Sequence, residues 1–273
     1  MTDTGGTDTQ APQRRSRWTI PLVVAGIVVL AAAGGLYLFF SGDAPPEVDL
    51  AATAEAVTQA SSTTAAPQDS GPTTAAPQDS TTTEAPAAGI DGAWTVDTSV
   101  GEFTVTEATT ASFVGFRVDE ELSSIGATTA VGRTPNVSGS ISIDGTVVTS
   151  VEVTADMTAI VSDRSRRDGA IQRALNTGAN PNATFVLSEP IDLGDEALNG
   201  DLVATTASGQ LTVNGISNQI TIDIEAQLVG DAILITGTTD VVFSDYDVSV
   251  PAAPVVLSVE DNGIIELQLW MAR

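Results

Sequence analysis

The sequence contains no cysteine, no histidine and no lysine. Without cysteine the chain forms no disulfide and offers neither a thiolate nucleophile nor a sulfur ligand for metals. Without histidine it lacks the commonest general base and a frequent ligand of transition metals. We therefore expect no metal site, no cofactor and none of the hydrolase mechanisms that depend on these side chains.

Positive charge is scarce as well. Ten arginines face 35 acidic residues, which gives a formal net charge of −25 at pH 7. Because proteins hold nucleic acids largely through lysine and arginine that displace counterions, this balance predicts no nucleic-acid partner. The acidity is typical of a soluble, self-repelling surface.

One long run of the chain carries no charge. Residues 18–40, "WTIPLVVAGIVVLAAAGGLYLFF", are enough at about 1.5 Å per residue to cross a hydrocarbon core roughly 30 Å thick. Arg14, Arg15 and Arg17 precede the run, so the positive-inside rule places residues 1–17 in the cytoplasm and the remainder of the chain outside. A cleavable signal peptide is the alternative, but its apolar region is normally only about 7 to 15 residues long. We predict a single transmembrane helix in the cell membrane.

Residues 41–89 are rich in alanine, threonine, proline and serine. The segment "TTAAPQDS" at residues 63–70 recurs unchanged at residues 73–80. Because such a segment has few large apolar side chains to bury, it cannot offset the entropy lost on ordering. We predict a disordered linker over residues 41–89.

From residue 90 onward, apolar and polar residues alternate, which is typical of β-strands with one buried face. The clearest examples are "QITIDIEAQL" at residues 219–228 and "IIELQLWM" at residues 264–271. Turn signals separate such runs: "IDGT" at 143–146, "LNGD" at 198–201, "VNGI" at 213–216 and "EDNG" at 260–263. Since Asn-Gly and Asp-Gly favour hairpins, the strands are expected to be mostly antiparallel. This all-β pattern fits either two packed sheets or a closed barrel.

One segment has helical spacing instead. Ala170, Ile171, Ala174 and Leu175 recur at helical intervals. Ser165 and Asp168 resemble a capping box, and a glycine at 178 is suited to end the helix. Four of the ten arginines fall within residues 164–173. Three of them crowd the start of the helix, where the dipole disfavours cations. We expect carboxylate partners for them, or an anionic ligand at the mouth of a barrel.

Taken in order, six segments of the chain resemble the YceI-like polyisoprenoid-binding family. They are "WTVD" (94–97), "GSISIDG" (139–145), "VEVTADMTAIVSDRSRRDGAIQRAL" (151–175), "PNATFVLSEPI" (181–191), "GQLTVNGISNQITIDIEAQL" (209–228) and "SDYDVSVP" (244–251). The resemblance implies that residues 90–273 form a lipocalin-like, antiparallel, eight-stranded barrel. In this family the barrel holds an isoprenoid or isoprenoid-quinone chain, typically outside the cytoplasm. Arg167 and Asp168 match a pair that begins a short helix in the family, and we expect them to be structural.

We therefore expect a lipid-binding module whose partner is an isoprenoid-type lipid. The candidate lining residues are Phe113, Phe185, Leu187, Ile222, Ile224, Phe243, Leu267 and Leu269. The same side chains would also suit an ordinary packed core, in a barrel that binds nothing. A structural or interaction domain of the cell envelope, displayed on a stalk, is the alternative function.

An enzyme is the least favoured hypothesis. Its acid–base chemistry would need paired carboxylates such as Glu120 and Glu121, or Asp245 and Asp247. Neighbours on a strand point to opposite faces, so the glutamates are poorly arranged for joint chemistry. The aspartates, two residues apart, could share a face. We expect no catalytic activity.

Overall fold

In the computed structural model of this chain, the described residues are 44–64, 89–123, 126–249 and 256–273. The predicted transmembrane run at residues 18–40 and the cytoplasmic tail at 1–17 lie outside them. Within the described part of the chain, no helix is both long and apolar enough to cross a membrane.

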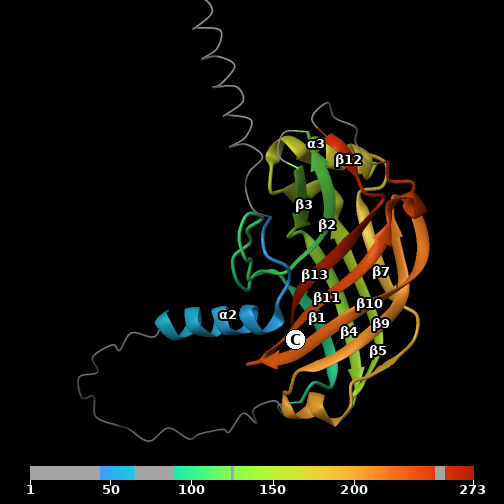
Figure 1. Cartoon of the computed structure of the whole chain (residues 1–273). Coiled ribbons are helices and arrows are strands. Elements are labelled where there is room, and N and C mark those ends of the chain that lie inside the picture. Colours follow the sequence, from blue (N-terminus) through green and yellow to red (C-terminus); the bar gives the residue numbers. More distant parts are fainter. Residues whose placement is uncertain (1–43, 65–88, 124–125, 250–255) are drawn as a thin grey trace, which may run out of the picture. The chain divides into compact units, whose positions relative to one another are not determined.

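Eight strands close into an antiparallel barrel, as the family resemblance implied. Their order around the barrel is β1, β4, β5, β7, β9, β10, β11 and β13, and β13 pairs back with β1 (Figure 1). The bounds of these strands are Gly92–Asp97 (β1), Val137–Asp144 (β4), Val147–Asp156 (β5), Asn182–Leu187 (β7), Val203–Val213 (β9), Ile216–Val229 (β10), Ala232–Val242 (β11) and Asn262–Ala272 (β13).

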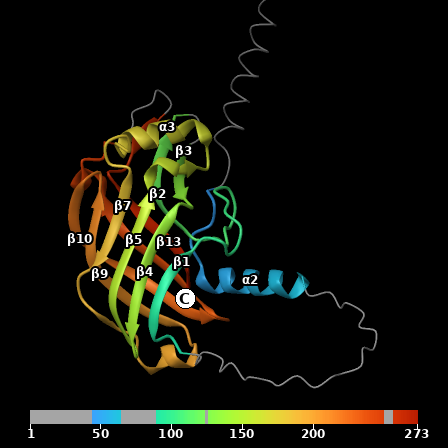
Figure 2. The ribbon, with the colours of Figure 1, turned by 180° about the vertical axis from the view of Figure 1, so that it is seen from behind.

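The other elements extend or cover this barrel (Figure 2). On the first part of β13, β2 takes over from β1, and β3 and β6 follow outward, while β12 pairs with β2 and β8 with β5. The bounds are Phe113–Leu122 (β2), Gly126–Thr134 (β3), Val161–Ser162 (β6), Ile191–Asp192 (β8) and Val256–Val259 (β12). The helices are α2 (Leu50–Thr64) and α3 (Ser165–Ala174), with the short 3-10 helices η1 (Met157–Ala159), η2 (Asp195–Asn199) and η3 (Phe243–Tyr246).

Two of the four predicted turns join hairpins. "IDGT" connects β4 to β5 and "VNGI" connects β9 to β10. Asn214 and Gly215 both have positive φ, 52° and 76°, as a tight two-residue hairpin turn requires. The other two hairpin predictions are wrong. "LNGD" lies at the end of η2. "EDNG" connects β12 to β13, but these two strands do not pair with each other, because β12 pairs with β2.

The predicted helix is confirmed as α3, but its predicted cap is wrong. Ser165 is the first helical residue, and the N-cap, Arg164, makes no capping side-chain bond. Asp168 instead accepts hydrogen bonds from the backbone N–H and the hydroxyl of Ser162, at 2.8 and 2.6 Å. The helix ends at Ala174 with Leu175 as its C-cap, and Asn176, with φ of 51°, turns the chain before Gly178.

The disordered-linker prediction is wrong for residues 44–64, while residues 65–88 lie outside the described part. Alanine-rich sequence forms helix readily, and an Asp49 carboxylate oxygen accepts a hydrogen bond from the backbone N–H of Ala52 at 2.9 Å, which caps α2. Leu50 is fully buried against Leu234 and Trp270. Burial of Leu50 is therefore one of the contacts that dock this segment onto the barrel.

The docked segment covers the outer face of β13, where the sequence pattern predicted polar residues facing outward. Glu266 is completely buried and accepts a hydrogen bond from Arg133 Nε at 2.7 Å, with Arg117 Nη1 at 3.5 Å. The same arginines also donate to the backbone of the docked segment. Arg117 Nη2 lies 2.8 Å from the carbonyl oxygen of Pro45, and Arg133 Nη2 lies 2.8 Å from that of Pro46.

Two further side chains on this face are buried and hydrogen-bonded. Gln268 accepts a hydrogen bond from the Thr53 hydroxyl at 2.8 Å and donates to the carbonyl oxygen of Ala111 at 2.8 Å. Trp270 donates from Nε1 to the carbonyl oxygen of Thr110 at 2.8 Å. Polar residues on alternate positions of β13 therefore fix the N-terminal segment and the loop before β2.

Replacing Glu266 by Gln is expected to lower the free energy of unfolding by about 3 kcal/mol or more, because it leaves two buried guanidinium groups without their carboxylate. Glu225, exposed on the outer face of β10, provides a matched control that loses the same charge, and Glu225→Gln is expected to change stability by less than about 0.5 kcal/mol. Denaturant unfolding followed by tryptophan fluorescence measures both variants. Equal stability of the two variants would show that the arginine–glutamate cluster does not hold this face together.

Candidate binding cavity

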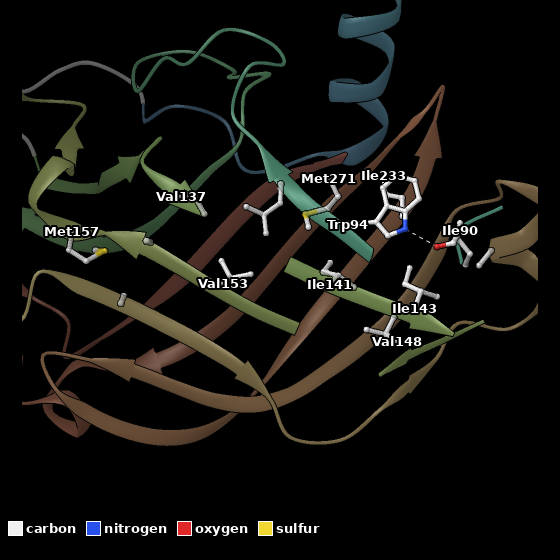
Figure 3. Close-up of a cluster of buried hydrophobic side chains, with 14 of the residues drawn as sticks. Ile90, Trp94, Val137, Ile141, Ile143, Val148, Val153, Met157, Ile233 and Met271 are labelled. Atoms are coloured by element: carbon white, nitrogen blue, oxygen red, sulfur yellow. Dashed lines mark hydrogen bonds between the residues drawn. The ribbon is translucent and has the colours of Figure 1, made fainter. Parts of the chain in front are cut away.

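The barrel contains an apolar cavity with a volume of about 150 Å³. Its walls come from seven of the eight barrel strands, namely β4, β5, β7, β9, β10, β11 and β13. Figure 3 shows Ile141, Ile143, Val148 and Val153 projecting from β4 and β5 into this interior. Because the cavity is lined mainly by valine, isoleucine, leucine and alanine, it offers space to an apolar chain.

Strand alternation explains why the apolar side chains point inward. On β10, Ile220, Ile222, Ile224, Ala226 and Leu228 all line the cavity. On β13, Ile265, Leu267 and Leu269 do the same, while the residues between them face the docked segment. Apolar residues at every second position of β10 and β13 therefore form the inner wall of the barrel.

The eight candidate lining residues divide into two groups. Five of them line the cavity: Phe185, Ile222, Ile224, Leu267 and Leu269. Three are not among the lining residues: Phe113 packs under the guanidinium of Arg133, 4.5 Å from ring centroid to Cζ, on the outer side of β13, while Leu187 and Phe243 pack against the buried cluster that contains Phe185 and Leu211. Binding by any of the eight stays a prediction.

At one end, the cavity is bordered by η2 and by the chain on either side of it. Leu193, Ala197 and Asp201 line the cavity here, together with Ile90 before β1. In Figure 3, the indole of Trp94 donates to the carbonyl oxygen of Ile90, at 2.8 Å. We call this region the η2 end.

At the other end, the cavity is bordered by larger side chains. Phe185, Leu211 and Ile220 line the cavity there, and Tyr246 packs against the same cluster. Burial raises the pKa of the Tyr246 hydroxyl. Beyond them, α3 contributes Ile171 to the edge of the main core, and Figure 1 shows α3 lying across this end of the barrel. We call it the α3 end.

Four of the residues at the wall of the cavity are polar: Thr184, Asp201, Thr205 and Gln227. Sequence reasoning missed all four. Thr205 could have been found, because it alternates with Val203 and Ala207 on the inward face of β9. Gln227 lies on the opposite register of β10 and lines the cavity only because the strand ends there, where its amide donates to the carbonyl oxygen of Gly200 at 3.3 Å.

The arginines of α3 have carboxylate partners. Arg167 forms ion pairs with Glu120 on β2 and, at 3.3 Å, with Asp163. Arg164 lies 3.6 Å from Asp163. Burial raises the pKa of Glu120, and the nearby Arg167 guanidinium opposes that shift. Arg167 and Asp168 therefore bind different partners, and each fixes one side of the start of α3.

The carboxylate pairs considered for catalysis are not brought together as the enzyme hypothesis requires. Glu120 is buried and paired with Arg167, while its neighbour Glu121 is exposed. Asp245 and Asp247 are exposed and lie within and just after η3, where Asp247 has a left-handed backbone conformation. In the described ranges, no three metal-ligating residues are grouped so as to hold an ion.

Comparison with known proteins places this geometry in a family. Residues 94–271 match the YceI-like domain. Among solved structures, a polyisoprenoid-binding domain from Saccharophagus degradans, implicated in plant cell wall breakdown, is 17% identical with a TM-score of 0.50. The alignment covers 67% of this chain and 99% of that domain.

Two more solved structures are similar at lower scores. BcnA of Burkholderia cenocepacia is 18% identical with a TM-score of 0.46, over 58% of this chain and 95% of BcnA. A YceI protein of Campylobacter jejuni is 19% identical with a TM-score of 0.42, over 51% of this chain and 82% of that one. No curated protein matches the sequence.

Proposed function

We propose that this chain, which belongs to the YceI-like domain family, binds an isoprenoid-type lipid inside its barrel, without catalysis. The observation that carries the proposal is the cavity lined by apolar side chains from seven barrel strands. The solved domain with the same fold is a polyisoprenoid-binding domain, which supports the proposal further. An isoprenoid alcohol and an isoprenoid quinone share the branched apolar chain that this lining suits.

The energetics favour a ligand held by its hydrocarbon chain. Burial of one five-carbon isoprene unit contributes about 4 kcal/mol, at about 0.8 kcal/mol per carbon, before entropic costs. An apolar cavity of about 150 Å³ is large enough for a molecule of the size of benzene. One isoprene unit therefore fits the present space, and a longer chain occupies the barrel when leucine and isoleucine side chains of the lining rotate aside.

We further propose that the barrel lies outside the cytoplasmic membrane, anchored by residues 18–40. The spacer between the proposed membrane helix and the barrel is shorter than the predicted linker, because the backbone of Pro45 and Pro46 is already hydrogen-bonded to the barrel. Only residues 41–44 then separate the proposed span from a fixed part of the domain, in place of a linker of residues 41–89. A short spacer suits a protein that takes up or releases a membrane lipid, and so supports a role in lipid transport or storage.

The alternative is an envelope domain with a structural or interaction role and no lipid. The same anchor would serve it. The cavity favours lipid binding, because a barrel selected only for rigidity gains stability when its interior is filled.

A phenylalanine placed in the cavity is expected to abolish lipid binding. Ala207 is buried and lines the cavity, whereas Ala204, three residues away on the same strand, is exposed on the outer face. We expect Ala207→Phe to lower the affinity for geranylgeraniol at least tenfold, because the ring fills the space, and Ala204→Phe to leave it unchanged. Displacement of a fluorescent isoprenoid from the full-length protein in a nonionic detergent measures both.

A second variant, Ala226→Phe on β10, separates loss of space from loss of folding, because it fills the cavity from another strand. Circular dichroism and the unfolding midpoint report whether each variant is folded. Folded Ala207→Phe and Ala226→Phe proteins that bind as well as the parent would contradict the proposed site. Failure of the parent to bind any isoprenoid would contradict the function itself.

The proposed anchor makes a separate prediction. The full-length protein is expected to stay with the membrane fraction after carbonate extraction, and deletion of residues 18–40 is expected to release it. Proteolysis of intact spheroplasts from the outside should degrade the barrel. Release of the undeleted protein by carbonate, or protection of the barrel from external protease, would exclude this topology.

A further inference from the structure

We propose that the cavity selects lipids whose polar end carries no negative charge, so that it takes an isoprenoid alcohol, quinone or hydrocarbon and rejects the corresponding phosphate or diphosphate. This inference rests on the proposed function and narrows its ligand class. It is carried by the charges around the cavity.

The lining itself contains no cation. None of the residues that line the cavity is an arginine, and the single charged residue among them, Asp201, is an exposed acid. A phosphate held inside would be removed from water without a positive partner, which is strongly unfavourable. The hydroxyl of Thr205, which lies on the inward face of β9, is a neutral hydrogen-bonding partner suited to a hydroxyl or a carbonyl oxygen.

The η2 end is surrounded by carboxylates. Hydrogen bonds tie its parts together: Gly145 N–H donates to Asp91 at 2.8 Å, and the Thr146 hydroxyl donates to Asp192 at 3.2 Å. The turn between β10 and β11 lies near the chain that follows η2, because Ala226, close to the end of β10, pairs with Val203 at the start of β9. Seven exposed acidic residues gather on these turns: Asp91, Asp144, Asp192, Asp195, Glu196, Asp201 and Asp231.

One arginine of the described chain lies at this end, and it is already engaged. The guanidinium of Arg273 donates to the carbonyl oxygens of Gly89 and Asp91 and stacks over the ring of Trp94, 4.4 Å from the centroid. Arg273 keeps its positive charge, but the seven carboxylates outnumber it, so a lipid phosphate arriving at the η2 end would meet a net negative rim. Charges within about 10 Å act on one another at 0.1 M salt, so several of these carboxylates repel it together.

The arginines at the α3 end do not change this conclusion. Arg164 and Arg167 face Asp163, and Arg167 also pairs with Glu120. Arg173 donates from Nε to the carbonyl oxygen of Gly169 at 2.8 Å. None of the α3 arginines lines the cavity, and the α3 side chain that packs against the main core is the apolar Ile171. The carboxylates at the η2 end are therefore the charges that act most strongly on the polar end of a bound lipid.

The test compares two probes with the same twenty-carbon chain, geranylgeraniol and geranylgeranyl diphosphate, in displacement of a fluorescent isoprenoid. The full-length protein is used in a nonionic detergent at about 20 mM and about 300 mM salt. We expect the alcohol to bind at least tenfold more tightly than the diphosphate at low salt, and the ratio to shrink at high salt because screening weakens the repulsion.

Charge variants locate the source of the selectivity. We expect the combined change Asp195→Asn with Glu196→Gln to improve diphosphate binding about two- to fivefold at low salt and to leave alcohol binding unchanged. Asp223→Asn together with Glu225→Gln removes the same charge from the outer wall of β10, where both residues are exposed, and is the matched control that should have no effect. A third variant, Arg173→Gln, should also leave both affinities unchanged.

The outcomes separate this inference from the function on which it rests. Binding of the alcohol with equal or tighter binding of the diphosphate would overturn the charge selection while leaving lipid binding intact. Loss of diphosphate binding in Arg173→Gln would overturn it too, because an anion would then sit at the α3 end. Binding of neither probe would remove the proposed function and this inference with it.

Discussion

Closure of the barrel is the constraint on which the rest of this structure depends. Once β13 pairs with both β11 and β1, every barrel strand has one face turned to a common interior and one turned outward. Apolar residues at alternate positions are then gathered around a single axis, and no sheet edge remains within the eight-stranded ring. The cavity is a consequence of this closure, because branched side chains of modest size do not fill the interior completely.

The outer face of β13 carries polar side chains that are buried and hydrogen-bonded. Glu266, Gln268 and Trp270 alternate with cavity-lining residues and would otherwise project from the wall. The N-terminal segment covers these side chains. Arg117 and Arg133 link Glu266 to the backbone carbonyl oxygens of Pro45 and Pro46 in that segment. One strand, β13, therefore lines the cavity with one face and holds with the other face the segment that leads toward the proposed membrane anchor.

Much of the fold could be predicted from the sequence, because period two on β10 and β13 and the Asn-Gly turn at 214–215 are local signals with direct physical meaning. The family resemblance added barrel closure, which periodicity alone leaves undecided. The docked segment was missed, because its burial depends on Leu50 meeting Trp270, 220 positions later in the chain. Apolarity alone suggests that Phe113 lies in the cavity, whereas the structure pairs it with the outward-facing Gln268 and stacks Arg133 on its ring.

The central claim is that the interior of this barrel holds the hydrocarbon chain of a lipid. A crystal structure of the protein with geranylgeraniol tests it most directly. We predict continuous density along the axis, in contact with Ile222 and Leu267 and with the hydroxyl near Thr205 or Gln227. Side chains closed over an empty or filled interior, with the ligand elsewhere, would contradict the account.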